Sequence, residues 1–264
     1  MKHRLVLIKL GGSVITYKEK PLSANYKAIN NISKILSKLE IPLIIVHGGG
    51  SYGHYWSVKF DMHTKLQKYP PRGISVVHSS MLTLNNIIIY SLNKHRLNPY
   101  GISPSSFLIT GQPNSNKILE LKKMTKDNII PVTYGDAVYI INNKYSIVSG
   151  DVLMSMLSKI LNPSKIIFAL NVDGLYNNMK EKKIIKEIKF ETAKIYKNKQ
   201  TKINLINDTN IDDVTGGMKR KVEEATKMAE TGKDVIFING LDPRQIQNAI
   251  QDKNFKGTIF KGKI

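Results

Sequence analysis

The chain has 264 residues, 41% of them hydrophobic and 23% charged, a composition typical of a globular protein with one large domain or two lobes. The richest apolar run, "LTLNNIIIYSL", is interrupted by Asn85 and Asn86 and falls short of the roughly 18 residues that a membrane span needs. The chain contains no cysteine, which excludes disulfides and thiolate metal sites and favours a cytoplasmic location.

The net charge of +20 allows two interpretations. Clustered Lys and Arg would favour nucleic-acid binding, whereas a general lysine bias would give a solvated basic surface. The sequence shows no zinc-finger, RRM or homeodomain-like pattern, so we favour the second interpretation. We therefore expect neither a nucleic acid nor a membrane as partner, although a basic field would speed the capture of anionic substrates.

The first elements alternate between strand and helix patterns. Residues 3–10 ("HRLVLIKL") predict a buried strand, and apolar spacing over 23–40 predicts a helix with Ser23 as its N-cap. The run "IPLIIV" (residues 41–46) predicts a second strand. This order is typical of a βαβ unit with parallel strands.

The alternation continues downstream. Two polar stretches, about 110–128 and 176–214, are longer than usual connections and are predicted to be surface loops. The other predicted elements are a strand in "IIPVTYG", a hairpin turning at Asn142-Asn143, a helix opened by Asp151 and ended by Asn162-Pro163, a strand in "KIIFALNV", a helix from Gly216 stopped by Gly232, a strand in "DVIFI" and a helix started by Asp242-Pro243.

These elements predict an α/β protein with an open, mainly parallel sheet between helices, a three-layer αβα arrangement. We expect one domain, residues 1–264, with an N-terminal lobe of about 1–162 and a C-terminal lobe of about 163–264. Such sheets bind ligands beyond the carboxyl ends of their strands. The glycine motifs "KLGGS", "HGGGS" and "NVDG" all follow strands at that edge.

The motif "IKLGGSVITYK" is neither a Walker A loop nor a G-x-G-x-x-G motif. Its small residues Gly11, Gly12 and Ser13 nevertheless let backbone N–H groups approach an anion. Lys9 lies at the strand end, where its ammonium group could reach the same anion. The alternative is a tight strand–helix turn with a surface lysine.

The motif "HGGGSYGH" places a second run of small residues after the next strand and adds His54. Two such loops side by side indicate two phosphate-bearing ligands, or one phosphate passed between them. Histidine can donate a hydrogen bond to phosphate near neutral pH, which gives His54 a possible function. The alternative is a packing or surface histidine.

Two further motifs contain charged residues beside helix starts. Asp151 in "VSGDVL" is either an N-cap or a charged partner for lysines. In "DVTGGMKRK", Lys221 falls in the first turns of a helix, where positive charge is unfavourable unless an anion lies there.

These motifs, in this order, resemble the amino-acid-kinase superfamily, which transfers the γ-phosphoryl group of ATP to a carboxylate or phosphate oxygen. The resemblance runs from Lys9 to Lys221 and the closing "GTIF". Within the superfamily, "GGSVIT" followed by Lys18, "HGGGSYGH", "SGDVL" and "DVTGGMKRK" resemble the isopentenyl phosphate kinases most. One departure is Asn171, where many relatives have an acidic or threonine-type residue.

The resemblance implies that ATP, with Mg²⁺ on its phosphates, phosphorylates isopentenyl phosphate to isopentenyl diphosphate in a homodimeric enzyme. It places the acceptor phosphate in the N-terminal lobe and the nucleotide in the C-terminal lobe. The implied catalytic residues are Lys9, Lys18, Asp151 and Lys221, and no protein metal ligand is expected. The implied acceptor-binding residues are Gly49, His54 and Gly150, and the implied ATP-binding residues are Lys9, Gly11, Gly12, Ser13, Gly50, Asp173, Gly216, Gly217 and Lys221.

Two other hypotheses remain open at this point. A kinase of the same fold acting on another small phosphate or phosphonate is one, because fosfomycin kinases resemble this family and share the histidine. A basic nucleic-acid-binding protein on a kinase fold is the other. The apolar stretch Val76–Leu92 could wall a pocket for a five-carbon tail or simply pack into the core.

Overall fold

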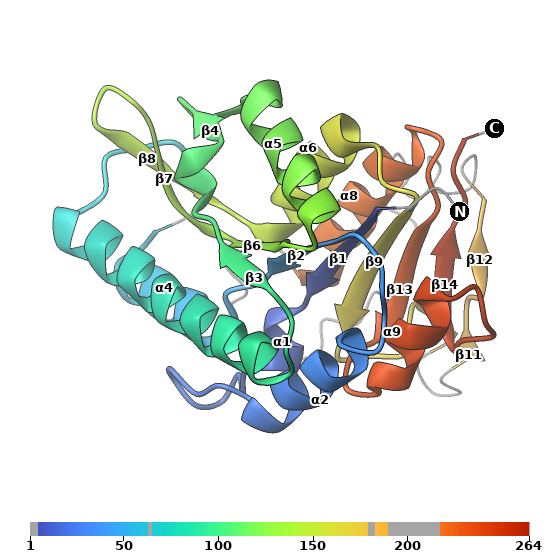
Figure 1. Ribbon diagram of the computed structural model, residues 1–264. Coiled ribbons are helices and arrows are strands. Elements are labelled where there is room, and N and C mark those ends of the chain that lie inside the picture. The colour runs from blue at the N-terminus through green and yellow to red at the C-terminus, as the bar shows by residue number, and fades with distance from the viewer. Residues whose placement is uncertain (1–4, 63–64, 179–182, 190–216, 264) are drawn as a thin grey trace.

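A single eight-stranded sheet forms the centre of the computed structural model, which describes residues 5–62, 65–178, 183–189 and 217–263 (Figure 1). Neighbouring strands are parallel except for the pair β13 and β14. The spatial order is β12 (Glu187–Ile188), β14 (Gly257–Phe260), β13 (Val235–Asn239), β9 (Lys165–Leu170), β1 (Val6–Leu10), β2 (Leu43–His47), β6 (Ile130–Tyr134) and β3 (Pro99–Gly101).

Helices cover both faces of this sheet, as the predicted three-layer arrangement requires (Figure 1). One face packs against α1 (Gly12–Ile15), α2 (Tyr26–Leu36), α4 (Pro71–Lys94) and α9 (Pro243–Ile250). The other face packs against α5 (Ser115–Met124), α6 (Gly150–Leu161) and α8 (Gly217–Ala229). Helix α3 (Gly50–Lys59) lies against α4.

Side-chain alternation in β1 determines which layer each residue faces. Val6, Ile8 and Leu10 belong to the core under α2, α4 and α9, whereas Leu7 belongs to the opposite core. Because side chains alternate with a period of two along a strand, Lys9 projects to the same side as Leu7, toward α6 and α8. The strand pattern therefore sends a lysine into an otherwise apolar layer.

The strand β1 has β2 on one side and β9 on the other, all parallel and in register at their carboxyl ends. The chain leaves β1 toward β2 through α1 and α2, and it reaches β9 only after α6. Such a point, where the order of strands changes direction, opens a crevice beyond the strand ends. The glycine motifs after β1 and β2 lie at this crevice.

The first long helix begins at Tyr26, so the prediction that Ser23 caps it was wrong. Asn25 is the N-cap, and its side chain accepts a hydrogen bond from the N–H of Ala28 at 3.1 Å. The chain before it is held in extended form, because Ala24 forms an antiparallel bridge with Thr16. Helix propensity before Asn25 is overruled by this pairing.

The hairpin prediction was confirmed, and the loop predictions were partly wrong. Strands β7 (Asp136–Ile141) and β8 (Lys144–Val148) are joined by Asn142 and Asn143, both with positive φ, as a tight turn requires. Stretch 110–128 contains β5 (Gln112–Pro113), which pairs with β4 (Leu108–Ile109), and α5, whose many lysines obscure a short apolar pattern.

Stretch 176–214 is also not a plain loop where it is described. It contains β10 (Tyr176–Asn178), β11 (Lys183–Ile184) and the edge strand β12; residues 179–182 and 190–214 lie outside the described residues. Short 3₁₀ turns occur at Pro104–Ser106 and Thr125–Asp127. Within the described chain, no helix combines the length and apolar character of a membrane span.

We expect Phe237→Ala to reduce the free energy of unfolding by about 3–5 kcal/mol. Phe237 is fully buried, and its ring lies between those of Phe168 (5.2 Å between centroids) and Phe260 (4.9 Å), so truncation would leave a cavity. Urea denaturation followed by circular dichroism measures the change. Tyr90→Ala, at a side chain 74% exposed, is the control, and a loss of less than about 1 kcal/mol for Phe237→Ala would contradict this packing.

Candidate active site

A buried ion pair lies at the carboxyl end of β1. The ammonium nitrogen of Lys9 is 2.5 Å from a carboxylate oxygen of Asp151, and the two residues are 4% and 3% exposed. Asp151 is the second residue of α6, whose N-cap is Ser149, which accepts the N–H of Val152 at 3.4 Å. Of the two roles considered for Asp151, N-cap is therefore wrong, and charged partner of a lysine is confirmed.

A second lysine reaches the same carboxylate from α8. Nζ of Lys221 is 3.9 Å from the other oxygen of Asp151 and donates to the carbonyl of Gly217 at 3.2 Å. Burial alone would raise the pKa of Asp151, but the nearby charges of Lys9 and Lys221 outweigh it and hold that pKa below its usual value. The carboxylate is thus ionised at neutral pH.

This cluster carries more positive than negative charge. One buried carboxylate faces two lysines, and the charge of Arg220 also acts on it. The amino end of α6 adds backbone N–H groups at Gly150. An unbalanced cation in a low-dielectric site attracts an anion, so the cluster is built to hold negatively charged groups.

The two glycine loops touch each other through their backbones. A Cβ on Gly12 would lie 2.4 Å from the backbone nitrogen of Gly50, and one on Gly48 would lie 2.8 Å from that of Gly12. Gly50 has φ +48°, and a Cβ there would overlap the hydroxyl of Thr16. Only glycine permits this approach, which brings the loops after β1 and β2 into one surface.

The residues predicted to bind the acceptor are Gly49, His54 and Gly150. A Cβ on Gly150 would lie 3.1 Å from Cε of Lys9 and 3.2 Å from the carbonyl oxygen of His47, so Gly150 borders the ion pair directly. Gly49 precedes α3 as its N-cap, and His54 lies half-buried in the second turn of that helix. The structure thus brings Gly49, Gly50, Gly150 and Lys9 to one edge.

The loop after β9 is held by its own side-chain contacts. One carboxylate oxygen of Asp173 accepts from Nδ2 of Asn239 at 2.9 Å, and the other is 2.7 Å from Nζ of Lys256. The hydrogen bonds from Lys256 and Asn239 lower the pKa of Asp173. Asp173 therefore ties the ends of β9 and β13 to the segment before β14.

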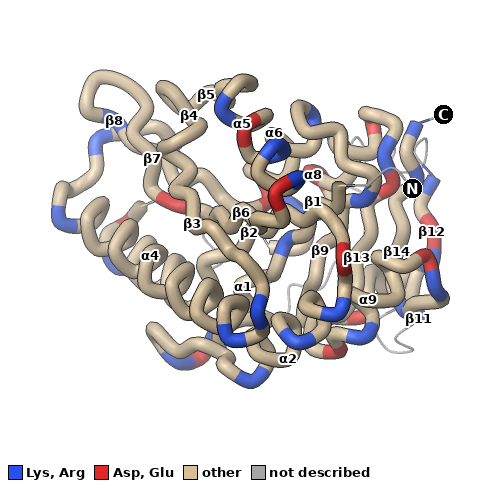
Figure 2. Tube along the Cα trace, viewed as in Figure 1, with Lys and Arg blue, Asp and Glu red and all other residues tan. Residues whose placement is uncertain are grey.

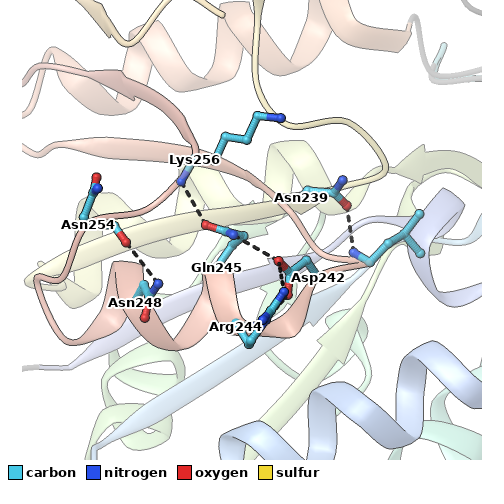
Figure 3. A network of polar contacts seen from close by, with 8 residues as sticks. Asn239, Asp242, Arg244, Gln245, Asn248, Asn254 and Lys256 are labelled. Carbon is cyan, nitrogen blue, oxygen red and sulfur yellow. Dashed lines mark hydrogen bonds and ion pairs between the residues drawn. The ribbon is translucent and has the colours of Figure 1, made fainter.

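The same network continues into α9 (Figure 3). The amide oxygen of Gln245 accepts from the N–H of Lys256 at 2.8 Å, and its amide nitrogen donates to Asp242 at 3.0 Å. Asp242, the predicted N-cap of this helix, accepts from the N–H of Arg244 at 3.2 Å. These contacts fix the edge of the sheet beside the predicted nucleotide loop.

The other predicted site residues lie at varying distances from the charged cluster. Gly11 packs against the carbonyl of Ala169 in β9, and Ser13 lies in α1. Lys18 is half-buried in the turn after α1, and no described contact joins it to Asp151. Gly217 opens α8 with φ +54°, whereas Gly216 lies outside the described residues.

The sequence analysis missed several polar residues that support the site. His47 is fully buried beside the carbonyl of Gly48, and burial lowers its pKa to about 4, so its ring is neutral. Its Nε2 is 3.3 Å from Oδ1 of Asn85, one of the two asparagines that interrupt the apolar run of α4. In the sequence, the interruption of this apolar run was the one sign that Asn85 has a polar partner. A second missed pair joins His78 to Asp136 at 2.6 Å.

Two bulk properties bear on possible ligands. Among residues 5–62, 65–178, 183–189 and 217–263, no group of three or more His, Cys, Asp or Glu side chains could hold a metal ion. In the view of Figure 2, Lys and Arg are scattered along the described chain rather than gathered on one element. This distribution agrees with a solvated basic surface.

Comparisons with known proteins agree with this geometry. The model of the amino acid kinase family matches residues 4–239. The isopentenyl phosphate kinase of Thermoplasma acidophilum is 30% identical over 97% of this chain and 100% of its own length. That of Methanocaldococcus jannaschii is 33% identical over 93% of this chain and 95% of its own.

Solved structures give the same grouping. A product complex of the T. acidophilum isopentenyl phosphate kinase has a TM-score of 0.78 at 27% identity, covering 97% of this chain and 100% of that one. A Giardia carbamate kinase, at 15% identity and a TM-score of 0.69, covers 100% of both chains and shares the fold alone. The chain belongs to the amino acid kinase family and, within it, to the isopentenyl phosphate kinases.

Proposed function

We propose that this chain transfers the γ-phosphoryl group of ATP to isopentenyl phosphate, giving isopentenyl diphosphate and ADP. The observation that carries the proposal is the buried cluster of Lys9, Asp151 and Lys221 where two glycine loops meet. The relatives that match nearly the whole chain bear the name of this activity.

The chemistry fits a site without a strong general base. A phosphate-monoester oxygen is already anionic at neutral pH, so it can attack the γ-phosphorus directly while the bond to the bridging oxygen of ADP breaks. The transition state is loose, and catalysis depends on positioning and on stabilising charge. Bringing two anions together requires cations and N–H donors, which the cluster and the glycine loops provide.

We assign the roles of the central residues accordingly. Lys9 and Lys221 stabilise the transferred phosphoryl group, and Asp151 orients both ammonium groups. Lys18 assists on the γ-phosphate side when ATP is bound. The backbones of Gly11, Gly12, Ser13 and Gly50 contact the phosphates of ATP.

The acceptor phosphate lies between Gly49 and Gly150 in this proposal, with His54 donating a hydrogen bond to it. Gly150 starts α6, so its N–H lies at the positively polarised amino end of that helix. The close approach of Lys9 to Gly150 supports a position for the acceptor beside the charged cluster. His54 would then select acceptors that end in a phosphate or phosphonate group.

The nucleotide lies in the C-terminal half, about residues 163–264, and the acceptor in the N-terminal half, about residues 1–162. Gly216 and Gly217 line the nucleotide site before α8. Asp173 also lines this site, with its carboxylate oriented by Asn239 and Lys256. Mg²⁺ would bind to ATP phosphate oxygens and water, as is usual for this cation.

Two further properties remain proposals. We expect a homodimer, because the family resemblance implies one. We expect a cytoplasmic location, because a chain without cysteine suits a reducing compartment that contains ATP.

A coupled ADP-release assay tests the proposed function directly. We expect turnover with isopentenyl phosphate and ATP, and much less with fosfomycin, because the apolar side chain of Met81 in α4 lies beside Gly49. Dimethylallyl phosphate is the matched isoprenoid comparison. Absence of turnover with isopentenyl phosphate would overturn the assignment.

Asp151→Asn is expected to lower kcat by about 100-fold or more, because the two lysines lose the charge that orients them. Glu120→Gln, at an exposed surface pair, is the matched control. Steady-state kinetics with circular dichroism to verify folding measures the effect. A kcat within about threefold of wild type would argue against this role.

The difference in stability between wild type and Asp151→Asn should depend on pH. The pKa of Asp151 is lowered in the folded protein, so its ion pairs contribute stability above the unfolded pKa and lose it as pH falls through the folded pKa. Wild type should therefore be more stable than Asp151→Asn at neutral pH, with the difference shrinking in acid. Thermal melts at several pH values check the trend, and a pH-independent difference would contradict it.

His54→Ala is expected to raise the KM for isopentenyl phosphate by about tenfold while the KM for ATP changes little. The reason is that, of the two substrates, the imidazole donates to the acceptor and not to ATP in the proposed arrangement. Initial rates at varied concentrations of each substrate separate the two constants. Equal increases in both would rule out a specific contact with the acceptor.

A further inference from the structure

One face of α4 contacts both the triple-glycine loop after β2 and the turn after β6, the two sides of the proposed acceptor crevice. His78, Met81 and Asn85 are spaced three and four residues apart, so they lie along one face of the helix. Met81 and Asn85 are buried, and His78 is partly exposed. Asn85 reaches His47 at the end of β2, and His78, at the exposed end of this face, reaches Asp136 after β6.

The first link of α4 is to the triple-glycine loop. Asn85 contacts the ring of His47, the residue just before Gly48. The sulfur of Met81 lies 3.3 Å from the position that a Cβ on Gly49 would occupy. The hydroxyl of Ser80 also donates to the carbonyl of Tyr52 in α3, at 3.0 Å. The helix therefore supports the loop from behind.

The second link is the ion pair between His78 and Asp136. Nδ1 of His78 is 2.6 Å from one carboxylate oxygen of Asp136, and the other oxygen accepts from the N–H of Ala137 at 2.8 Å. The Asp136 side chain is fully buried, so it requires a charged or hydrogen-bonded partner. The hydrogen bond that His78 donates to Asp136 raises the pKa of His78, which favours the charged imidazolium.

Asp136 lies next to the acceptor site through Gly135. The N–H of Gly135 donates to the carbonyl of His47 at 3.3 Å, and a Cβ on Gly135 would lie 2.9 Å from the nitrogen of Gly150. The turn from β6 to β7 is thus packed between the triple-glycine loop and the start of α6. A shift of Asp136 would move the backbone that borders Gly150.

We propose that His78 and Asp136 are positioning residues for the acceptor: their ion pair fixes α4 against the β6–β7 turn, and so sets the separation of Gly49 and Gly150. Neither side chain touches the acceptor in this role. The proposal rests on the proposed function only for the identity of the acceptor phosphate. It assigns a function to two residues that the phosphate-loop motifs do not include.

The test compares His78→Ala with His78→Asn in the full chain. The asparagine amide can place a donor near the position of Nδ1 and keep the bond to Asp136, whereas alanine cannot. His95→Ala is the matched control, because His95 caps the far end of α4 and contacts Asn30 instead. KM values for acceptor and ATP, kcat and thermal midpoints are measured for each protein.

We expect His78→Ala to raise the acceptor KM by about tenfold, with the ATP KM within about twofold, because only the acceptor geometry is disturbed. His78→Asn should recover most of the loss, and His95→Ala should change neither constant. Equal changes in both KM values, an unchanged acceptor KM, or an asparagine variant as impaired as the alanine variant would each overturn the proposal.

The assay also distinguishes this proposal from the proposed function. If wild type does not use isopentenyl phosphate, the proposed function fails, and the same comparison is made with whichever of dimethylallyl phosphate and fosfomycin wild type phosphorylates. If wild type uses isopentenyl phosphate but the KM values do not separate as expected, only the positioning role of His78 and Asp136 fails.

Discussion

The buried pair of Lys9 and Asp151 is the interaction on which the arrangement of the site depends. It joins the central strand β1 to the start of α6, and Lys221 extends it to α8. A buried pair of this kind contributes little net stability, but removing one partner leaves an uncompensated charge at a cost of about 3–5 kcal/mol. The site therefore carries a net positive charge, opposite in sign to the phosphate groups of its substrates. The fold tolerates this charge because the two lysines share one carboxylate.

Backbone contact between glycines is the second constraint. Gly12 and Gly50 approach too closely for any side chain, and this contact merges two loops from neighbouring strands. On the other side of the second loop, α4 supplies Met81 and Asn85 as a packed support. The charged cluster and the glycine surface therefore come from different layers of the molecule, and the parallel strands bring them to one edge.

Much of this arrangement could be predicted from the sequence, because its signals are local. The strand–glycine motifs, the Asn142-Asn143 turn and the Asp242-Pro243 helix start are all read over a few residues. The start of α2 was misplaced because the Thr16–Ala24 bridge is a tertiary effect. The pairs His47–Asn85 and His78–Asp136 could not be predicted, since each joins residues far apart in the chain through packing alone.

The distance along the chain between the members of the charged cluster has a consequence for folding. Lys9 and Asp151 are separated by 142 residues, and Lys221 comes from a helix near the end of the chain. Contacts of such long range form late, because loop closure must precede them. During synthesis, Lys9 is made long before Asp151 and Lys221, the residues that it joins in the cluster. We therefore expect the site to assemble late in folding, and a chain stopped before α8 would have the glycine loops without the second lysine.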